Sequence, residues 1–281
     1  MRPPASHNID DATVSGFGAE WDAFDQSGLG ADEHRQLFDH YFHIFPFESL
    51  SAGAEGFDLG CGSGRWAMLV ADKPQVGRLH CIDPAAKALA VAQRRVTSPK
   101  ADFHLAAADT IPLADASQDF GYSLGVLHHV PDTAAALKAC TAKLKPGAPF
   151  LLYLYYRFDQ RPLWFRTLWR ASDLGRRGIS RLPFPVRKAV TGVIAAAVYW
   201  PLARSAKLLE RMGANVGSFP LSGYRNTSFY TMRTDALDRF GTRLERRFTR
   251  AEIAAMMADA GLTDVRFSDR FPFWVAVGRR A

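Results

Sequence analysis

The chain has 281 residues, 48% of them hydrophobic and 22% charged, which is the composition of a globular protein with a sizeable core. Its longest apolar run, 189–203, is shorter than the roughly 20 residues that a membrane-spanning helix needs, and its start lacks a signal-peptide pattern. Its three cysteines lack the spacing of zinc or iron–sulfur ligands, which indicates free thiols in a reducing cytoplasm. The net charge of +7 is uneven, with −6 over residues 1–150 and +13 over residues 151–281, which predicts an anionic partner for the second half unless its arginines serve only solubility.

The first 150 residues indicate an α/β fold. Residues 8–50 are predicted to be helical, and "ADEHRQLFDHYFHIF" (31–45) sets aromatic side chains at three- and four-residue spacings before Pro46 ends the helix. From Gly56 to the apolar run "APFLLYLYY" (148–156), short strands and helices alternate. Such alternation predicts a parallel sheet that helices cover on both faces.

The alternation stops at about residue 156 and resumes near residue 248. A helix then begins with Thr249 as N-cap and Glu252 as its capping-box partner and ends at Gly261, and two strands follow that should pair antiparallel. We therefore predict a core at 51–155 and 248–281, a helical, basic insertion at 156–247, and a helical N-terminal segment at 1–50.

The stretch "FDLGCGSGRWA" (57–67) raises the question of why glycines recur at every second position. A strand, then glycines, then a helix is the geometry of nucleotide binding, because glycine lets the backbone approach a ligand. Asp83 ends the next strand, 21 residues beyond Gly62, where an acid that binds ribose is expected. The dinucleotide-binding pattern G-x-G-x-x-G would place a third glycine at position 65, but this chain has Arg65 there. A tight structural turn is the alternative.

This glycine pattern, Asp58-Leu-Gly60-Cys-Gly62-Ser-Gly64, resembles motif I of the class I S-adenosylmethionine-dependent methyltransferases, D/E-x-G-x-G-x-G. "CIDPA" and "LAAADTIPLADASQDF" resemble the family's second- and third-strand regions, and "FGYSLGVLHHVPD" resembles the fourth-strand motif of its small-molecule, methyltransferase-11-like branch. The resemblance covers about 50–155 and 248–280. It implies a Rossmann-like, mostly parallel seven-stranded sheet with an antiparallel last strand, S-adenosylmethionine as cofactor and S-adenosylhomocysteine as product.

The resemblance also implies which residues bind the cofactor. Asp83 would hold the ribose and Asp109 the adenine amino group. The other positions that it implies are Asp58, Gly60, Cys61, Gly62, Gly64, Pro84, Thr110, Ile111 and Leu124. "GFGAEWDAF" (16–24) resembles the N-terminal lid that folds over the cofactor in many relatives, which would place Trp21 against it; ordinary helix packing is the alternative.

His128 and His129 directly follow the fourth predicted strand, where the acceptor should enter. Histidine is a suitable base near neutral pH, so either side chain is a candidate catalytic residue. Family members commonly carry an acid at the position of His128, and this departure weakens the transfer of an acid–base role. The alternative is that the pair holds the loop before Pro131.

The insertion should decide the acceptor. Residues 156–247 hold 18 Lys or Arg and six Asp or Glu. Within 161–207, arginines interleave with Trp and Leu, which is typical of an element on an anionic membrane surface, whereas a helical cap over the active site with a buried apolar face is the alternative.

The segment 223–241 is predicted to end in a short helix capped by Thr234 and closed by Gly241. Its polar side chains suit a carboxylate or phosphate group of an acceptor. The candidate acceptor-binding residues are Tyr224, Arg225, Tyr230 and Arg233.

These observations predict an enzyme, cytoplasmic or associated with a membrane surface, that methylates a small-molecule or lipid- or glycan-linked acceptor, with oxygen favoured over nitrogen or carbon. An RNA methyltransferase is the second hypothesis, but the fourth strand lacks the Asn/Asp-Pro-Pro-aromatic signature of base methylation. A cofactor-binding protein that transfers no methyl group is the third. The sequence predicts neither the acceptor nor the oligomeric state.

Overall fold

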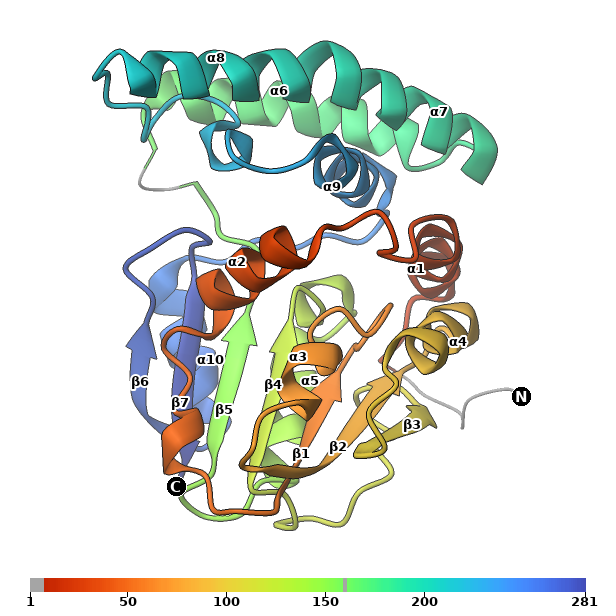
Figure 1. The fold of residues 1–281 in the computed structure, drawn as a ribbon, viewed down its shortest axis with the longest axis vertical. Coiled ribbons are helices and arrows are strands. Elements are labelled where there is room, and N and C mark those ends of the chain that lie inside the picture. Colours follow the sequence, from red (N-terminus) through yellow and green to blue (C-terminus); the bar gives the residue numbers. More distant parts are fainter. Residues whose placement is uncertain (1–7, 159–160) are drawn as a thin grey trace. The chain divides into compact units, whose positions relative to one another are not determined.

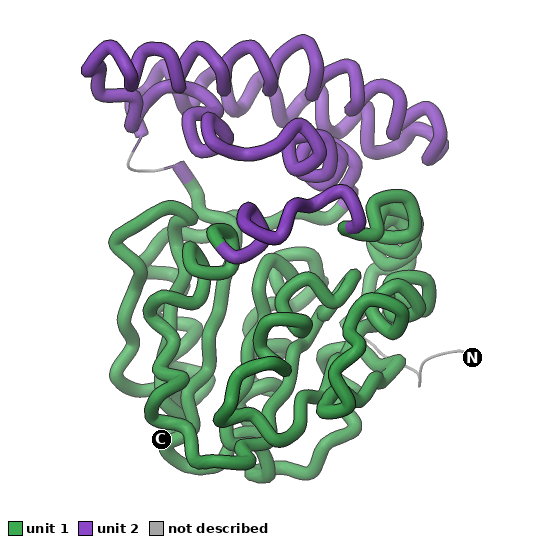
Figure 2. The backbone as a smooth tube through the Cα atoms, in the orientation of Figure 1, with its two compact units in different colours: residues 1–26, 36–157, 244–281 green, residues 27–35, 158–243 purple. Residues whose placement is uncertain are grey.

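A seven-stranded sheet organises the computed structural model, which describes residues 8–158 and 161–281 (Figure 1). The chain divides into two units (Figure 2). Unit 1 comprises residues 1–26, 36–157 and 244–281 and contains the sheet, and unit 2 comprises residues 27–35 and 158–243.

The strand order of the sheet is β3-β2-β1-β4-β5-β7-β6. Only β7 runs antiparallel to its neighbours, β5 and β6. The strands are β1 (Ala54–Leu59), β2 (Val76–Asp83), β3 (Ala101–Leu105), β4 (Phe120–Leu124), β5 (Pro149–Tyr153), β6 (Leu262–Phe267) and β7 (Val275–Arg280). The predicted fold class is thereby confirmed. The order reverses between β1 and β4, and ligands of open α/β sheets bind at the carboxyl ends of strands at such a reversal.

Apolar side chains cover both faces of the sheet. Along β5, Leu151 and Tyr153 join one buried cluster, whereas Phe150 and Leu152 join the other. The helices of this unit and its 3-10 turns are α1 (Asp11–Ala23), the end of α2 (Ala31–Phe42), η1 (Phe47–Ser49), α3 (Ala67–Ala71), α4 (Ala86–Arg95), η2 (Leu127–His129), α5 (Thr133–Ala142) and α10 (Arg250–Asp259). Two-sided burial explains why the parallel strands read as continuous apolar runs.

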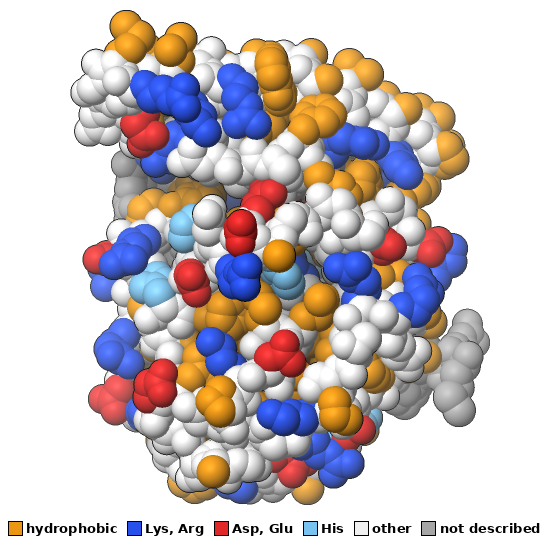
Figure 3. Space-filling model, viewed as in Figure 1, with side chains coloured by type: hydrophobic (Ala, Val, Ile, Leu, Met, Phe, Trp, Pro, Cys, Tyr) orange, Lys and Arg blue, Asp and Glu red, His pale blue; other side chains and the backbone are white. Residues whose placement is uncertain are grey.

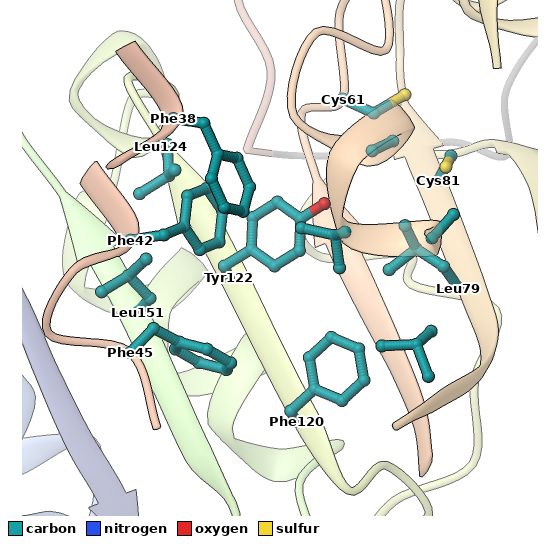
Figure 4. Close-up of a cluster of buried hydrophobic side chains, with 14 of the residues drawn as sticks. Phe38, Phe42, Phe45, Cys61, Leu79, Cys81, Phe120, Tyr122, Leu124 and Leu151 are labelled. Carbon is teal, nitrogen blue, oxygen red and sulfur yellow. The ribbon is translucent and has the colours of Figure 1, made fainter. Parts of the chain in front are cut away.

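Phe38 and Phe42 of α2 belong to the first of these clusters, together with Tyr122 of β4 (Figure 4). Phe42 stacks on Phe38 with ring centroids 4.2 Å apart and meets the edge of Tyr122 at 5.2 Å. The predicted spacing of aromatics in this helix therefore buries one helical face against β4.

Local capping sets the ends of α10 as predicted. Thr249 accepts a hydrogen bond from the backbone of Glu252, and the Glu252 side chain accepts one from the backbone of Thr249. Gly261, just beyond the helix, has φ of +79°, a conformation that glycine adopts readily.

Unit 2 is helical. Helix α9 (Phe229–Gly241) packs against α6 (Leu163–Ile179), α7 (Phe184–Ile194) and the π-helical η3 (Ala195–Tyr199). Helix α8 (Trp200–Arg211) continues directly from η3, and a 3-10 turn, η4 (Ser222–Tyr224), precedes α9. The predicted cap of α9 at Thr234 is wrong. Ser228 caps the helix because its extended backbone lets its hydroxyl accept from Thr231, whereas Thr234 lies inside and donates to the Tyr230 carbonyl.

Charged side chains hold both ends of α9. At its start, the Glu33 carboxylate accepts hydrogen bonds from the backbone of Ser228 and from the Thr231 hydroxyl, each 2.8 Å long. At its end, the buried guanidinium of Arg176 donates to the Thr242 carbonyl, and that of Arg187 donates to the Gly241 carbonyl. An acid at the N-terminus and cations at the C-terminus satisfy unpaired backbone groups and oppose the helix dipole.

Candidate functional site

The glycine loop after β1 has a left-handed backbone conformation that strains residues with a side chain. Gly60, Gly62 and Gly64 have φ values of +78°, +55° and +77°. The backbone N–H groups of Gly60 and Cys61 both donate to the Ile82 carbonyl at the end of β2. The alternating glycines are therefore required by the backbone itself, because residues with a Cβ are strained in the left-handed region.

Three different neighbours fill the space beside these glycines. A Cβ on Gly60 would lie 2.3 Å from a methyl of Val126, and one on Gly64 would lie 2.5 Å from a methyl of Val96. A Cβ on Gly62 would instead lie 3.0 Å from the indole nitrogen of Trp21. Gly62 is thus the position where α1 approaches the loop, as the predicted lid role of Trp21 requires.

Asp83 ties the loop to the end of β2. One of its carboxylate oxygens accepts a hydrogen bond from the Gly62 N–H (2.9 Å), and the other accepts one from the Ala85 N–H (2.8 Å). Burial raises the pKa of Asp83 to about 6, and the two backbone N–H donors oppose this rise. Each oxygen keeps a second lone pair that can accept from a hydroxyl group.

Asp58 is the most deeply buried acid of the site. Burial raises its pKa to about 8, an effect that the Tyr122 hydroxyl partly offsets and the charge of Asp83 reinforces. Ser63 is also buried, and its hydroxyl has no hydrogen-bond partner within the described part of the chain. A buried acid whose pKa is strongly raised is typical of a functional site.

Asn8, near the N-terminus, forms hydrogen bonds with the segments that follow β3 and β4. The N–H of Asn8 donates to the exposed Asp109 carboxylate (3.1 Å), and the Asn8 side chain exchanges two hydrogen bonds with the backbone of Asp132. Thr110 closes a turn by bonding to Ala107. Asn8 is a site residue that sequence reasoning missed, because a lone Asn in a polar segment carries no signal.

The two histidines after β4 differ in their surroundings. His129 Nδ1 lies 2.7 Å from the Leu244 carbonyl, and a carbonyl only accepts, so Nδ1 carries the proton. His128 is fully buried, and neither ring nitrogen has a hydrogen-bond partner in the region that the structure describes. Burial, followed by the charges of His129 and Arg247, holds the pKa of His128 well below its usual value.

Tyr155 and Arg247 complete this cluster, and sequence reasoning had singled out neither. The Tyr155 ring lies 3.9 Å from that of His128, centroid to centroid, and the Arg247 guanidinium lies 5.0 Å from the Tyr155 ring. Tyr155 falls in the predicted fifth-strand run, whereas Arg247 is the last residue of the predicted insertion. Only the fold brings it to the end of β5.

Helix α1 links the glycine loop to the histidines. Phe17 and Trp21 are four residues apart and so lie on one helical face. The Phe17 ring centroid is 4.9 Å from that of His129, while Trp21 lies against Gly62. One helix thus touches both the candidate cofactor loop and the candidate base.

This arrangement agrees with the comparison to known families. Residues 57–152 match the model of a methyltransferase domain, Methyltransf_11. Residues 57–152 therefore form a methyltransferase domain of the class I S-adenosylmethionine-dependent type. The matched residues run from β1 to β5 and include the glycine loop, Asp83, Asp109 and both histidines.

Curated methyltransferases resemble part of the chain. The ubiquinone biosynthesis O-methyltransferase of Aromatoleum aromaticum is 32% identical over 101 residues, which are 34% of this chain and 42% of that protein. The 27-O-demethylrifamycin SV methyltransferase of Amycolatopsis mediterranei is 30% identical over 136 residues, 47% of this chain and 48% of that protein. Phosphoethanolamine N-methyltransferase 2 of Caenorhabditis elegans is 28% identical over 45% of this chain and 28% of that protein. The chain spans less than half the length of each of these relatives.

A solved structure shares the fold over most of the chain. It is the methyltransferase in a complex with the Trm112 methyltransferase activator of Haloferax volcanii, with a TM-score of 0.50 and 17% identity over 92% of this chain and 97% of that chain. At this identity, the likeness shows the methyltransferase fold alone.

The residues of the methyltransferase loop fit S-adenosylmethionine. Gly62 offers backbone without a Cβ, Asp83 offers spare lone pairs for ribose hydroxyls, and Ser63 offers a buried hydroxyl. Across residues 8–158 and 161–281, no group of three His, Cys, Asp or Glu side chains is arranged to hold a metal ion. The cofactor contacts of Pro84, Thr110, Ile111 and Leu124 stay predictions.

The predicted acceptor-binding residues belong to unit 2 of the methyltransferase. Arg225 pairs with Glu210 at 2.8 Å and donates to the Ser222 carbonyl, and Tyr224 lies 5.3 Å from the Tyr199 ring. The Tyr230 ring lies against Gly28. These contacts build unit 2 itself, and the acceptor roles of Tyr224, Arg225, Tyr230 and Arg233 stay predictions.

Replacing Gly62 by Ala tests the loop. We expect Gly62→Ala to weaken binding of S-adenosylhomocysteine by more than about tenfold, because its Cβ displaces Trp21 from the loop. Gly147→Ala is the matched control, since Gly147 has φ of +81° but open space around it. Both variants should lose roughly 1–2 kcal/mol of stability from backbone strain. Equal affinities of the two variants in calorimetry would refute the assignment of the loop.

Replacing Asp58 by Asn tests the burial of that acid. The pKa of about 8 in the folded state exceeds the ordinary value of 3.8, so the folded state binds more protons between these values. The stability that this proton provides is complete below about pH 4 and is lost as the pH rises towards 8. We expect Asp58→Asn to raise the free energy of unfolding more at about pH 8.5 than at about pH 4.5.

Urea unfolding of the ligand-free protein at both pH values measures this effect. Asp115→Asn is the control, because Asp115 is an exposed acid. A gain in stability that does not vary with pH would show that Asp58 titrates normally.

Proposed function

We propose that this methyltransferase transfers a methyl group from S-adenosylmethionine to an oxygen of a small-molecule or lipid- or glycan-linked acceptor. The observation that carries the proposal is the link through α1 between the glycine loop and His129. One turn of α1 separates the side chain that contacts His129 from the one that contacts Gly62, and both contacts lie near the reversal of strand order where α/β sheets bind their ligands.

The bound cofactor supplies an electrophilic methyl group on a sulfonium. What remains for the chain is to orient the acceptor, exclude water and remove the acceptor's proton. Phe17 and Trp21 are suited to exclude water, because both rings lie over the elements that line the site. Asp83 keeps the loop in place through the Gly62 N–H.

His129 is the better base of the two histidines. Because its Nδ1–H is directed at the Leu244 carbonyl, a neutral His129 carries its lone pair on Nε2. The low pKa of His128 makes that side chain a weak proton acceptor. We assign His128 to packing against Tyr155, where a neutral ring is favoured by burial.

The relatives favour oxygen as the acceptor atom. Two of the named relatives carry O-methylation in their names or products, and one methylates nitrogen. A hydroxyl acceptor must lose a proton as the methyl group arrives, and the His129 imidazole is suited to take it.

Replacing His129 by Asn tests this role. The Asn amide can still donate to the Leu244 carbonyl, so the loop keeps its anchor while the base is lost. We expect kcat to fall by about 10²–10⁴-fold, with unchanged affinity for S-adenosylhomocysteine. The loss should shrink as the pH rises, because a hydroxyl acceptor ionises unaided. Unchanged kcat in His129→Asn would remove His129 from the mechanism.

Transfer of a labelled methyl group in three parallel reactions tests the acceptor class. The protein and labelled S-adenosylmethionine are incubated with a lipid extract, a small-metabolite extract or total RNA. Label in the lipid or metabolite fraction supports the proposal. Label in RNA alone would identify a nucleic-acid methyltransferase, and tight cofactor binding without any transfer would identify a non-methylating binder.

A further inference from the structure

Helix α6 exposes four large apolar side chains and buries two charged ones. Leu163, Trp164, Leu168 and Leu174 are 77%, 52%, 54% and 69% exposed. On the opposite side of the helix, the side chain of Asp173 is buried in ion pairs with Arg176 (2.7 Å) and Arg239 (3.7 Å). A helix in contact with water should have the reverse polarity, because burial of charge is costly and burial of leucine is favourable.

The continuous helical run α7–η3–α8 has the same inverted polarity. Arg187 and Thr191 are buried, while Val186, Val193 and Trp200 are 48%, 66% and 47% exposed. Val186 and Val193 are seven residues apart in α7 and so lie on one helical face, and Trp200 is exposed just beyond the π-helical η3. Leu208 extends the apolar face along α8 and is 59% exposed.

The inverted faces of α6 and α7–α8 both point away from α9. Arg176 of α6 and Arg187 of α7 reach the carbonyls at the end of α9, so the opposite sides of these helices are the exposed ones. Figure 3 shows hydrophobic side chains interleaved with Lys and Arg over the region of α7 and α8. We call the exposed side of residues 161–211 the outer face of unit 2.

The helices of the outer face carry a large excess of positive charge. Residues 161–211 contain 11 Lys or Arg and two Asp or Glu. Both acids are paired within unit 2, Asp173 with Arg176 and Glu210 with Arg225. The apolar side chains thus lie on helices whose exposed charges are mainly cationic, among them Arg170 and Arg181.

We propose that the outer face of unit 2 docks on an anionic lipid bilayer. Leucine, valine and tryptophan side chains enter the boundary between headgroups and acyl chains, and the arginines contact lipid phosphates. Trp164 and Trp200 suit this depth, since tryptophan favours the membrane interface. Among the described residues, no helix is both long and apolar enough to cross a membrane, so the helices lie along the surface.

Charge argues against the other occupants of this face. A second copy would bring like charges together, with no unpaired acid on the outer face of either copy to offset them. A nucleic acid would satisfy the arginines but leave Leu163, Leu168 and Leu174 in water. Only a surface that is both apolar and anionic complements both features.

Vesicle co-sedimentation of the full chain tests the proposal without depending on methyl transfer. Vesicles of phosphatidylcholine alone are compared with vesicles containing about one third phosphatidylglycerol, at low and high salt. We expect binding to the anionic vesicles only, weakened by salt. Trp164→Ala with Leu168→Ala should reduce the bound fraction about tenfold or more. Arg170→Gln with Arg181→Gln should reduce it about tenfold.

Phe271→Ala is the matched control, because Phe271 is 46% exposed but lies in unit 1. It should bind vesicles as the parent protein does. The proposal fails if the parent protein ignores anionic vesicles, or if the Trp164 and Leu168 double variant binds like the parent. It also fails if that double variant instead dissolves a dimer in sedimentation velocity or abolishes retention of RNA.

Discussion

The hydrogen bond from the Gly62 N–H to the buried Asp83 carboxylate is the constraint on which the candidate site depends. It joins the ends of β1 and β2 and holds three residues of positive φ in one loop. The loop then determines where Trp21 lies, and α1 carries Phe17 from there to His129. Burial of a carboxylate beside a second acid, Asp58, is costly, and acids with such raised pKa values gather at functional sites.

The two units differ in how their buried charged groups are stabilised. In unit 1, buried acids lie beside a loop that would bind a cofactor, whereas the interior of unit 2 holds both the ion pairs of Asp173 with Arg176 and Arg239 and an apolar cluster around Tyr199 and Met232. The charged part of this interior is tolerated because Arg176 and Arg187 also satisfy the carbonyls at the end of α9. Several large apolar residues of α6 and α7–α8 stay exposed, and the lipid surface that we propose would cover them.

Local patterns predicted most of the fold, since the strands, the capping box at Thr249 and the loop at Gly62 each depend on neighbouring residues. Contacts between distant residues were out of reach: Asn8 with Asp132, Phe17 with His129 and Arg247 with Tyr155. The cap of α9 was misplaced because Ser228 and Thr234 are both good N-cap residues. The apolar stripe of α6 was visible in the sequence, but periodicity cannot tell which side of a helix faces water.

Calorimetry with S-adenosylhomocysteine tests the central claim most directly. The parent protein should bind it, and Asp83→Ala should bind about 1–3 kcal/mol more weakly, because the ribose hydroxyls and the Gly62 N–H lose a charged acceptor. Asp115→Ala, which removes an exposed acid, should bind as the parent does. Absence of binding by the parent protein, or unchanged affinity in Asp83→Ala, would contradict the account.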